Sequence, residues 1–428
     1  MDTSYFSKFY KKTRLEKIQA LLDANILTEE DKQFLTQAPL LSDELANSMV
    51  ENQLTQYALP LGVALNLMVN GKEYAVPMVT EEPSVIAAAS SAAKTIAHAG
   101  GFDTTSTKRR MIGQVALTAV PDTTHAQKQL KLHKKNILNK ANQAHPSIVK
   151  RGGGADEVVV RFIEATEKSP EFLVVHVYID VQEAMGANIV NTMMEAIAPY
   201  LETLTGGKVL MGILSNYATE CLATAACRIP VDLLKRDGLS GEVVRDRLIE
   251  AAQFAYADPY RAVTHNKGIM NGIDAVVLAS GNDWRAIEAG AHAYAAKSGQ
   301  YRALSNWEKA DNGDLLGSLT LPMPIGFVGG SITIHPTAQF SQRLLSVKNA
   351  KELESVIVSV GLGQNFAALK ALVTEGIQKG HMGLQAKSLA ISAGATEQWI
   401  ELVADELKKA PHMNLKTAKT LLDKIKNK

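Results

Sequence analysis

The sequence predicts a mixed α/β fold of the α+β type, in which a ferredoxin-like domain is inserted into a larger domain of helices and strands. Residues 111–215 show the element order β-α-β-β-α-β, helices and strands alternate on either side, and the chain beyond Thr374 is helical. A β-α-β-β-α-β order permits one antiparallel sheet with both helices on one face. We therefore expect a large domain, an inserted small domain and a C-terminal helical unit.

Length and charge set the first limits on function. At about 150 residues per domain, 428 residues correspond to two or three domains. The 45 lysines and arginines nearly balance the 44 aspartates and glutamates, and the net charge of +1 argues against a nucleic-acid or membrane partner. The polar N-terminus has no apolar signal core, and no window reaches about 18 uncharged apolar residues. We expect a soluble, cytoplasmic protein.

The chain before the inserted domain is expected to contain two helical runs, a hairpin and a buried helix. Apolar residues recur at helical spacing in residues 13–36 and 40–54. Strand-like alternation then surrounds Asn70-Gly71, a strong signal for a hairpin turn. Residues 84–99 are mostly small or apolar and predict a tightly packed helix that ends at Gly100-Gly101.

The inserted domain should cover residues 111–215. No Gly-x-Gly-x-x-Gly follows a strand in it, which argues against a Rossmann domain. The expected strands are 112–120, 158–164, 172–181 and 209–214, and the expected helices are a long basic one at 124–143 and a second at 186–204.

The large domain should then occupy residues 1–110 and 216–373, with the insertion between them. Residues 374–428 are expected to form a C-terminal helical flap domain. Glycines at 376, 380 and 383 bracket His381, and such flexible flanks are typical of a mobile flap.

Cysteine usage gives no sign of a metal or redox site. Cys221 and Cys227 lie in an apolar stretch without Cys-x-x-Cys spacing or a nearby histidine. We expect two reduced core thiols and no metal.

The string Glu81-Glu82-Pro83-Ser84 places two carboxylates between the hairpin and the small-residue helix. Packing against such a helix can desolvate a carboxyl group and raise its pKa, which suits a proton donor. Acids at a helix N-terminus also interact favourably with the helix dipole, so the string alone leaves both interpretations open.

A second candidate segment runs from His265 to Asp274 and holds Lys267 between polar amides and glycines. A lysine in such a setting can stabilise an oxyanion, or it can lie on an exposed turn. Asp283, in Gly281-Asn282-Asp283-Trp284-Arg285, either caps the next helix or pairs with a buried cation.

The segment Glu183-Ala184-Met185-Gly186-Ala187-Asn188 ends a strand and opens a helix. Free backbone N–H groups and small side chains at a helix N-terminus can bind phosphate. Small residues also occur wherever a helix packs closely on a sheet, so the spacing by itself is weak evidence for a phosphate site.

Taken together, these strings closely resemble 3-hydroxy-3-methylglutaryl-coenzyme A (HMG-CoA) reductase from about residue 50 to the C-terminus. The type resembled is the soluble, bacterial class II enzyme, since the membrane anchor of class I is missing. The matching strings include the three segments above and also Asp258-Pro259-Tyr260-Arg261-Ala262, Gly326-Phe327-Val328-Gly329-Gly330 with His335-Pro336, and Thr374-Glu375-Gly376-Ile377-Gln378-x-Gly380-His381-Met382.

The resemblance implies a four-electron reduction of HMG-CoA to mevalonate and free coenzyme A (CoA) with two NAD(P)H, in the mevalonate pathway of isoprenoid biosynthesis. It implies that Lys267 stabilises the oxyanion, Glu82 donates a proton, Asp283 orients Lys267 and His381 protonates the CoA thiolate. The physiological direction stays open, because the same residues serve mevalonate oxidation.

The resemblance also assigns binding residues and a homodimer or higher even oligomer, with the active site where two large domains meet. Arg261 suits a bidentate contact with the substrate carboxylate. The substrate-binding residues implied are Ser84, Asn216, Arg261 and Asn271.

For the nicotinamide, the resemblance points to Glu183, Met185, Gly186, Ala187 and Asn188. Glu183 replaces the family's usual aspartate, and Glu51-Asn52-Gln53-Leu54-Thr55 departs from its usual Glu-Asn-Val-Ile-Gly near the dimer interface.

The preferred nicotinamide should depend on the stretch before Gly152. NADH-specific members carry an aspartate where this sequence has His145, and Lys150 and Arg151 follow. Basic residues accommodate a ribose 2′-phosphate, whereas an acid accepts from a free 2′-hydroxyl. We expect a preference for NADPH over NADH, unless the stretch is a solvated loop that never reaches the ribose.

Two other functions are compatible with parts of the pattern. A CoA-thioester hydrolase or lyase would release thiol without consuming reductant, and the ferredoxin-like insert could serve as a regulatory ligand-binding module. The second alternative is disfavoured because Glu82, Lys267, Asp283 and His381 all match the reductase.

Overall fold

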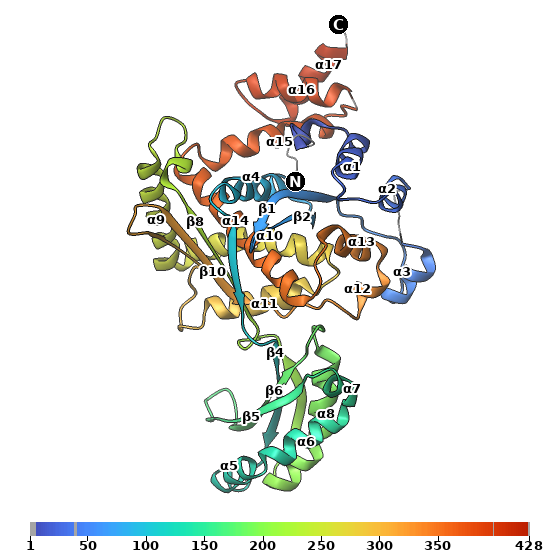
Figure 1. Cartoon of the computed structure of the whole chain (residues 1–428), viewed down its shortest axis with the longest axis vertical. Helices are drawn as coiled ribbons and strands as arrows, with labels where there is room; N and C mark the ends of the chain where they lie inside the picture. Colours follow the sequence, from blue (N-terminus) through green and yellow to red (C-terminus); the bar gives the residue numbers. More distant parts are fainter. Residues whose placement is uncertain (1–5, 38–40, 397, 427–428) are drawn as a thin grey trace.

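The computed structural model describes residues 6–37, 41–396 and 398–426, and the described side chains exclude those of residues 377–384 and 398. Within these residues it has a six-stranded sheet in the body of the molecule and a four-stranded sheet in a part that projects from it (Figure 1). Helices pack on both sheets and form a further unit at the C-terminal end. The predicted mixed α+β fold class is confirmed.

The large sheet has the strand order β2-β1-β3-β8-β10-β9, and only β1 and β3 are parallel neighbours. The expected hairpin is confirmed, with positive φ angles of 49° at Asn70 and 76° at Gly71, as a two-residue type I′ turn requires. The chain leaves the sheet after β3 and returns in its neighbour β8. The strands are β1 (Leu61–Val69), β2 (Lys72–Val79), β3 (Phe102–Ser106), β8 (Leu222–Ile229), β9 (Ser305–Lys309) and β10 (Leu315–Pro322).

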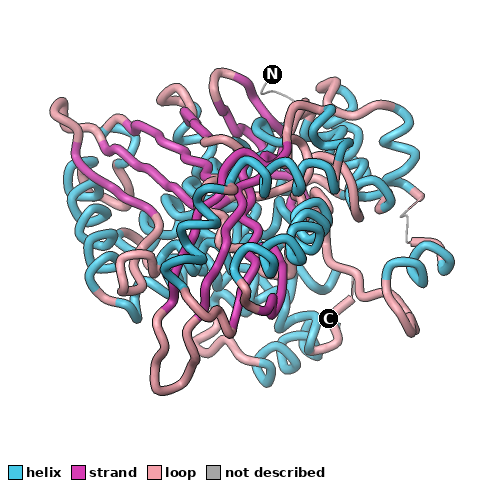
Figure 2. The backbone as a smooth tube through the Cα atoms, turned by 90° about the horizontal axis from the view of Figure 1, so that it is seen from below, coloured by secondary structure: helices cyan, strands magenta, loops and turns pink. Residues whose placement is uncertain are grey.

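Helices α4 (Val85–Ala97), α10 (Pro259–Ala279) and α14 (Ala350–Val373) pack against one another and against the large sheet. Figure 2 shows helices lying against the strands of the molecule. Helix α14 is 24 residues long and contains a window apolar enough to cross a membrane, but 67% of that window is buried in the protein, as in the core helix of a globular domain. The large domain also contains η3 (Val231–Leu234), α9 (Gly241–Ala257) and α11 (Trp284–Ala295).

The projecting part is antiparallel throughout, with the order β5-β6-β4-β7 that a ferredoxin-like domain requires. Every expected strand is present. The prediction of one long basic helix is wrong, because the helix is interrupted at His133. The Nδ1 atom of His133 lies 3.0 Å from the hydroxyl of Tyr200 on α8. The elements are β4 (Arg110–Thr118), α5 (Thr123–Leu132), α6 (Lys134–Ala144), α7 (Pro146–Lys150), β5 (Gly154–Ile163), β6 (Phe172–Asp180), α8 (Ala187–Thr205) and β7 (Lys208–Ser215).

The two helical runs expected near the N-terminus appear as short helices. Thr28 begins a second helix because its side chain and that of Asp31 cap it reciprocally. This helix packs on α13, where Phe34 stacks on Phe340 and Arg343 bonds Asp31 at 2.9 Å. The helices are η2 (Phe9–Lys11), α1 (Arg14–Asp23), α2 (Glu29–Thr36), α3 (Asp43–Met49), α12 (Ser331–Ile334) and α13 (Pro336–Leu345).

The last three helices form a unit with its own apolar cluster, at the opposite end of the molecule from the small domain (Figure 1). They are α15 (Ile377–Ser392), α16 (Gln398–Lys409) and α17 (Leu415–Lys426). Their helical character is as predicted, while the mobility of the unit as a flap and the exact domain boundaries stay predictions. Cys221 and Cys227 are buried with free thiols, as expected.

We predict that Asp31→Asn loosens the N-terminal helices. Burial alone would raise the pKa of Asp31, but hydrogen bonds from Arg343 and Thr28 hold it below its usual value. A lowered folded-state pKa gives stability that is present above the unfolded pKa and is lost as pH falls through the folded one. The variant should lose about 1–3 kcal/mol at pH 7, seen as a lower melting temperature.

The difference between wild type and Asp31→Asn should shrink as the pH falls below about 4, the ordinary range of an aspartate pKa. The control is Asp23→Asn, which changes an exposed carboxylate in the same segment. Equal melting temperatures for wild type and Asp31→Asn at pH 7 would contradict this account.

Candidate active site

Glu82 lies in the turn between β2 and α4, where the chain is strained. Ser84 adopts a left-handed conformation with φ 74°, which costs free energy for a residue with a side chain. Its Oγ is buried and has no hydrogen-bond partner within the described part of the chain. A buried hydroxyl without a partner is costly unless a ligand completes it, so the turn has the properties of a binding site.

Helix α10 brings Lys267 and Asn271 to Glu82. The helix begins with Asp258, whose side chain accepts from the Arg261 N–H, and Pro259 occupies its first turn. Residues four apart share a helix face, so Lys267 and Asn271 point the same way. Lys267 Nζ lies 2.5 Å from Glu82 Oε2, and Asn271 Nδ2 donates to Glu82 Oε1 at 3.2 Å. The fold therefore brings the acid at Glu82 to a cation and an amide that lie 185 and 189 residues later in the chain.

The pair is open to solvent in the single chain. The Lys267 side chain is 58% exposed and that of Glu82 is 35% exposed. Of the alternatives that the sequence left open, one chain alone therefore shows an exposed lysine and a partly exposed Glu82 carboxyl. Lys267 lies on a helix rather than on a turn, and water reaches it unless something else covers this face.

Arg261 is a half-buried cation one and a half turns before Lys267. Burial lowers the pKa of its guanidinium, and among the described residues its side chain has no hydrogen-bond or ion-pair partner. A partly desolvated guanidinium without a carboxylate favours binding of an anion.

The buried face of α10 is fixed by a polar network. His265 Nε2 lies 2.7 Å from Ser305 Oγ on β9 and 3.1 Å from Asn365 Nδ2 on α14. Trp307 Nε1 donates to Asn365 Oδ1 at 2.8 Å. Burial, and then the nearby Arg261, lower the pKa of His265 to about 3. This neutral histidine holds the helix that carries Lys267 and takes no proton at neutral pH.

Asp283 and Asn216 do not join this cluster in the single chain. Asp283 Oδ1 accepts from the Ala286 N–H at 3.1 Å and pairs with Arg285 at 3.7 Å. Lys267 lies 12 residues before the end of α10, which is about 18 Å of helix. Asn216 follows β7 and is exposed, and its carbonyl lies against Gly290 of α11.

Asp283 instead faces an open cavity of about 940 Å³. The cavity is also lined by the segment that departs from the family pattern, in which Leu54 is 95% exposed, and by Tyr57, which is 91% exposed. Exposed apolar side chains of this kind are typical of a surface that another protein covers.

His381 belongs to α15, but its side chain lies outside the described ones. Its expected role therefore stays a prediction.

The predicted cofactor segment has the geometry of an anion site. Gly186 adopts φ 94° at the N-cap of the 19-residue helix α8, with no side chain bonding the first amides. A Cβ at Gly186 would overlap the side chain of Val181, so only glycine fits. The unpaired N–H groups and positive helix end can then accept a phosphate.

The basic stretch lies beside this segment. Gly153 packs against Asp180 and Gln182 at the end of β6, and Gln182 Nε2 approaches the Gly152 carbonyl at 3.4 Å. Lys150 and Arg151 are exposed, and His145 Nδ1 lies 3.2 Å from Ser147 Oγ. The fold thus brings the two parts of the predicted nicotinamide site to one edge of the small domain. Across the described residues, no group of three or more His, Cys, Asp or Glu side chains could hold a metal.

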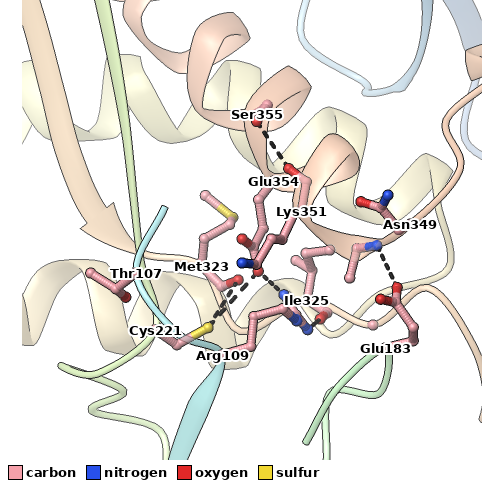
Figure 3. A network of polar contacts seen from close by, with 12 residues as sticks. Thr107, Arg109, Glu183, Cys221, Met323, Ile325, Asn349, Lys351, Glu354 and Ser355 are labelled. Carbon is pink, nitrogen blue, oxygen red and sulfur yellow. Dashed lines mark hydrogen bonds and ion pairs between the residues drawn. The ribbon is translucent and has the colours of Figure 1, made fainter. Parts of the chain in front are cut away.

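One pair of residues at the domain junction was missed by the sequence reasoning. Arg109 and Glu354 form a buried ion pair next to the cofactor segment (Figure 3). The signal in the sequence is the basic run Lys108-Arg109-Arg110 at the start of β4, which is equally typical of surface-exposed residues.

Comparison with known proteins gives concordant matches. A family model described as hydroxymethylglutaryl-coenzyme A reductase matches residues 11–386. The 3-hydroxy-3-methylglutaryl-coenzyme A reductase of Archaeoglobus fulgidus is 43% identical over 98% of this chain and 94% of its own. A probable reductase of Borreliella burgdorferi is 32% identical over 89% of this chain and 85% of its own.

Solved structures agree with these relatives. The reductase from Streptococcus pneumoniae is 49% identical, with a TM-score of 0.85 over 98% of this chain and 99% of that one. A structure of the same class II enzyme bound to NADPH in open conformations is also 49% identical, with a TM-score of 0.84 over 86% of this chain and 100% of that one.

We predict that Gly186→Ala destabilises the start of α8. The variant should lower the melting temperature by more than Gly299→Ala, a matched control with φ 89° and no atom within 4 Å of the added Cβ. Both changes strain the backbone, but only the first adds an overlap with a packed side chain. Adding Val181→Ala to Gly186→Ala should recover part of the loss, and equal losses for the two single variants would show that the overlap does not matter.

Proposed function

The chain belongs to the hydroxymethylglutaryl-coenzyme A reductase family, and we propose that the Glu82, Lys267 and Asn271 cluster performs the family's reaction. The enzyme reduces HMG-CoA to mevalonate and free CoA in the mevalonate pathway of isoprenoid biosynthesis, as an NAD(P)H-dependent oxidoreductase. The observation that carries the assignment is the 2.5 Å contact between Lys267 Nζ and Glu82 Oε2, with Asn271 on the other carboxylate oxygen.

The nicotinamide, when bound, supplies hydride to the carbonyl carbon of the substrate. The oxygen then gains negative charge, which the ammonium of Lys267 stabilises. Glu82 is within reach of the same oxygen because it contacts Lys267, so it donates the proton that completes the alcohol. Asn271 orients the carboxyl group through its amide.

Arg261 and Ser84 bind the other end of the substrate. The unpaired guanidinium suits the glutaryl carboxylate, and the buried Ser84 hydroxyl supplies a hydrogen bond that the free protein lacks. His381 protonates the CoA thiolate as it leaves, since an unperturbed histidine titrates near pH 6.5. Asn216 contributes to the same substrate pocket.

A homodimer or higher even oligomer completes the site. Asp283 follows the end of α10, which lies about 18 Å along that helix from Lys267, so the second copy supplies this carboxylate. The exposed Leu54 and Tyr57 at the cavity beside Asp283 mark the surface that the copy covers. Covering Lys267 in this way removes water and strengthens its interaction with the oxyanion. The assembly works in the cytoplasm with HMG-CoA, mevalonate and CoA as its small-molecule partners.

The experiment mixes the protein with HMG-CoA and NADPH and follows nicotinamide absorbance and free thiol together. Two NADPH consumed per CoA released is the expected result. Thiol release without oxidation of NADPH would favour a hydrolase or lyase, and no reaction with either nicotinamide would refute the proposal.

For His381, we predict that substitution by alanine slows reduction of the thioester HMG-CoA far more than reduction of the aldehyde. Only the thioester releases a thiolate that needs a proton, and loss of a general acid costs about 10²–10⁴-fold. The measurement compares kcat for HMG-CoA and for free mevaldehyde. His412→Ala changes another C-terminal histidine and serves as the control, and equal losses on the two substrates would remove this role from His381.

For the nicotinamide, we predict a preference for NADPH. We expect His145, Lys150 and Arg151 to bind the 2′-phosphate. A structure of a relative that is 49% identical holds NADPH, which supports the preference. One charge-assisted contact of about 1.5–3 kcal/mol corresponds to about 10- to 150-fold discrimination in kcat/KM. An NADH value equal to or above the NADPH value would overturn the preference. His145→Asp should lower kcat/KM for NADPH alone, and no effect on either cofactor would mean that another residue reads the phosphate.

A further inference from the structure

Arg109 lies where the chain passes from the large domain into the small domain. Its side chain is only 4% exposed. Nε donates to the Gln182 carbonyl at 2.7 Å, and Nη2 donates to the Ala184 carbonyl at 3.2 Å. Nη2 also donates to the carbonyl of Ile325 (Figure 3). Two of these carbonyls flank Glu183, the first residue of the cofactor segment.

The charge of Arg109 is balanced from the large domain. Nη1 pairs with Glu354 of α14, whose side chain is 2% exposed. The Cys221 thiol lies 3.9 Å from the same carboxylate and 3.8 Å from the Met323 carbonyl. A buried ion pair of this kind is stable only when further hydrogen bonds satisfy its polar atoms. Here the backbone carbonyls of Gln182, Ala184 and Ile325 accept from the guanidinium.

Glu183 forms a second connection to the large domain. Its Oε2 accepts from the Ala350 N–H at 2.6 Å, at the N-terminus of α14, where a negative charge is favourable. Its carbonyl accepts from the Phe327 and Val328 N–H groups at 2.7 and 3.3 Å. The backbone of residues 182–184 is therefore held by Arg109, by α14 and by residues 325–328.

We propose that Arg109, charge-balanced by Glu354, is a positioning residue for the nicotinamide, because it fixes the carbonyls of Gln182 and Ala184 and so sets the place of Met185 to Asn188. It touches neither substrate nor cofactor. The proposal rests on the assignment of the Glu183–Asn188 segment as the cofactor site. Helix α14 also bonds His265 through Asn365, so one helix sets the positions of both the cofactor segment and the Lys267 helix.

The test separates the ion pair from the carbonyl contacts. Arg109→Met leaves Glu354 buried and unpaired, which should lower the melting temperature strongly. The double variant Arg109→Met/Glu354→Met removes both charges and should recover much of the lost melting temperature. In both variants the backbone carbonyls remain without a donor. The dissociation constant of NADPH, measured by fluorescence titration, should therefore be about 5- to 50-fold higher than in the wild type for both. The KM for HMG-CoA should change less than about twofold.

Arg110→Met is the matched control. Arg110 is the next residue, and it pairs with Asp156, Glu157 and Glu220 rather than with the cofactor segment. The Arg110→Met variant should therefore bind NADPH with the affinity of the wild type. A double variant with wild-type affinity for NADPH would overturn the proposal. If the double variant does not fold, Arg109→Lys decides, since it keeps the charge but cannot reach all three carbonyls, and wild-type affinity there would equally overturn it.

The variant Asn188→Ala tests the proposed cofactor site separately from the positioning role of Arg109. Weaker NADPH binding by Asn188→Ala, together with weaker binding by the Arg109 variants, supports the proposal. Unchanged NADPH binding by Asn188→Ala would show that the segment is not the cofactor site, and the proposal would fall with it.

Discussion

The contact between Lys267 and Glu82 is the interaction on which the rest of the site depends. It joins a helix in the second part of the large domain to a turn in the first part. The entire small domain lies between these two parts in the sequence. The strained Ser84 backbone aims the turn, and the His265, Ser305 and Asn365 network holds α10 from its buried side. A change in either support moves the acid relative to the cation, and charge stabilisation depends on that geometry.

Helix α14 extends the same constraint to the other parts of the enzyme. Its N-terminus bonds Glu183, its first turns carry Glu354, and Asn365 in its later part holds His265. The chain continues from its end into α15, which contains His381. Its apolar character reflects the burial of 67% of its apolar window. A single helix therefore connects the predicted cofactor segment, the Lys267 helix and the C-terminal helices.

The sequence predicted much of the fold because local signals agree with it. Alternation around Asn70-Gly71 and the β-α-β-β-α-β order depend on periodicity and turn residues, and both appear in the structure. The break at His133 was missed, since a tertiary contact with Tyr200 accompanies it and no glycine or proline marks it. The pairing of Glu82 with Lys267 came from family resemblance, because no local pattern relates residues 185 positions apart.

Other features of the site depend on tertiary or quaternary contacts. The burial of Arg109 cannot be read from its neighbours, because its partners come from three separate segments. The Lys267 side chain is 58% exposed in one chain, an outcome that the sequence left open. Asp283 lies beyond the end of α10, about 18 Å of helix from Lys267, beside a cavity lined by exposed apolar residues. We propose that one active site requires Lys267 and Asp283 from two different copies.

Mixing two inactive variants tests this requirement most directly. Lys267→Ala and Asp283→Ala homodimers each lack one essential group in both sites. Unfolding and refolding them together in equal amounts should form heterodimers with one intact site, so that about a quarter of wild-type activity returns. Activity that stays at the level of the separate variants, with heterodimers shown to be present, would contradict an active site shared between two chains.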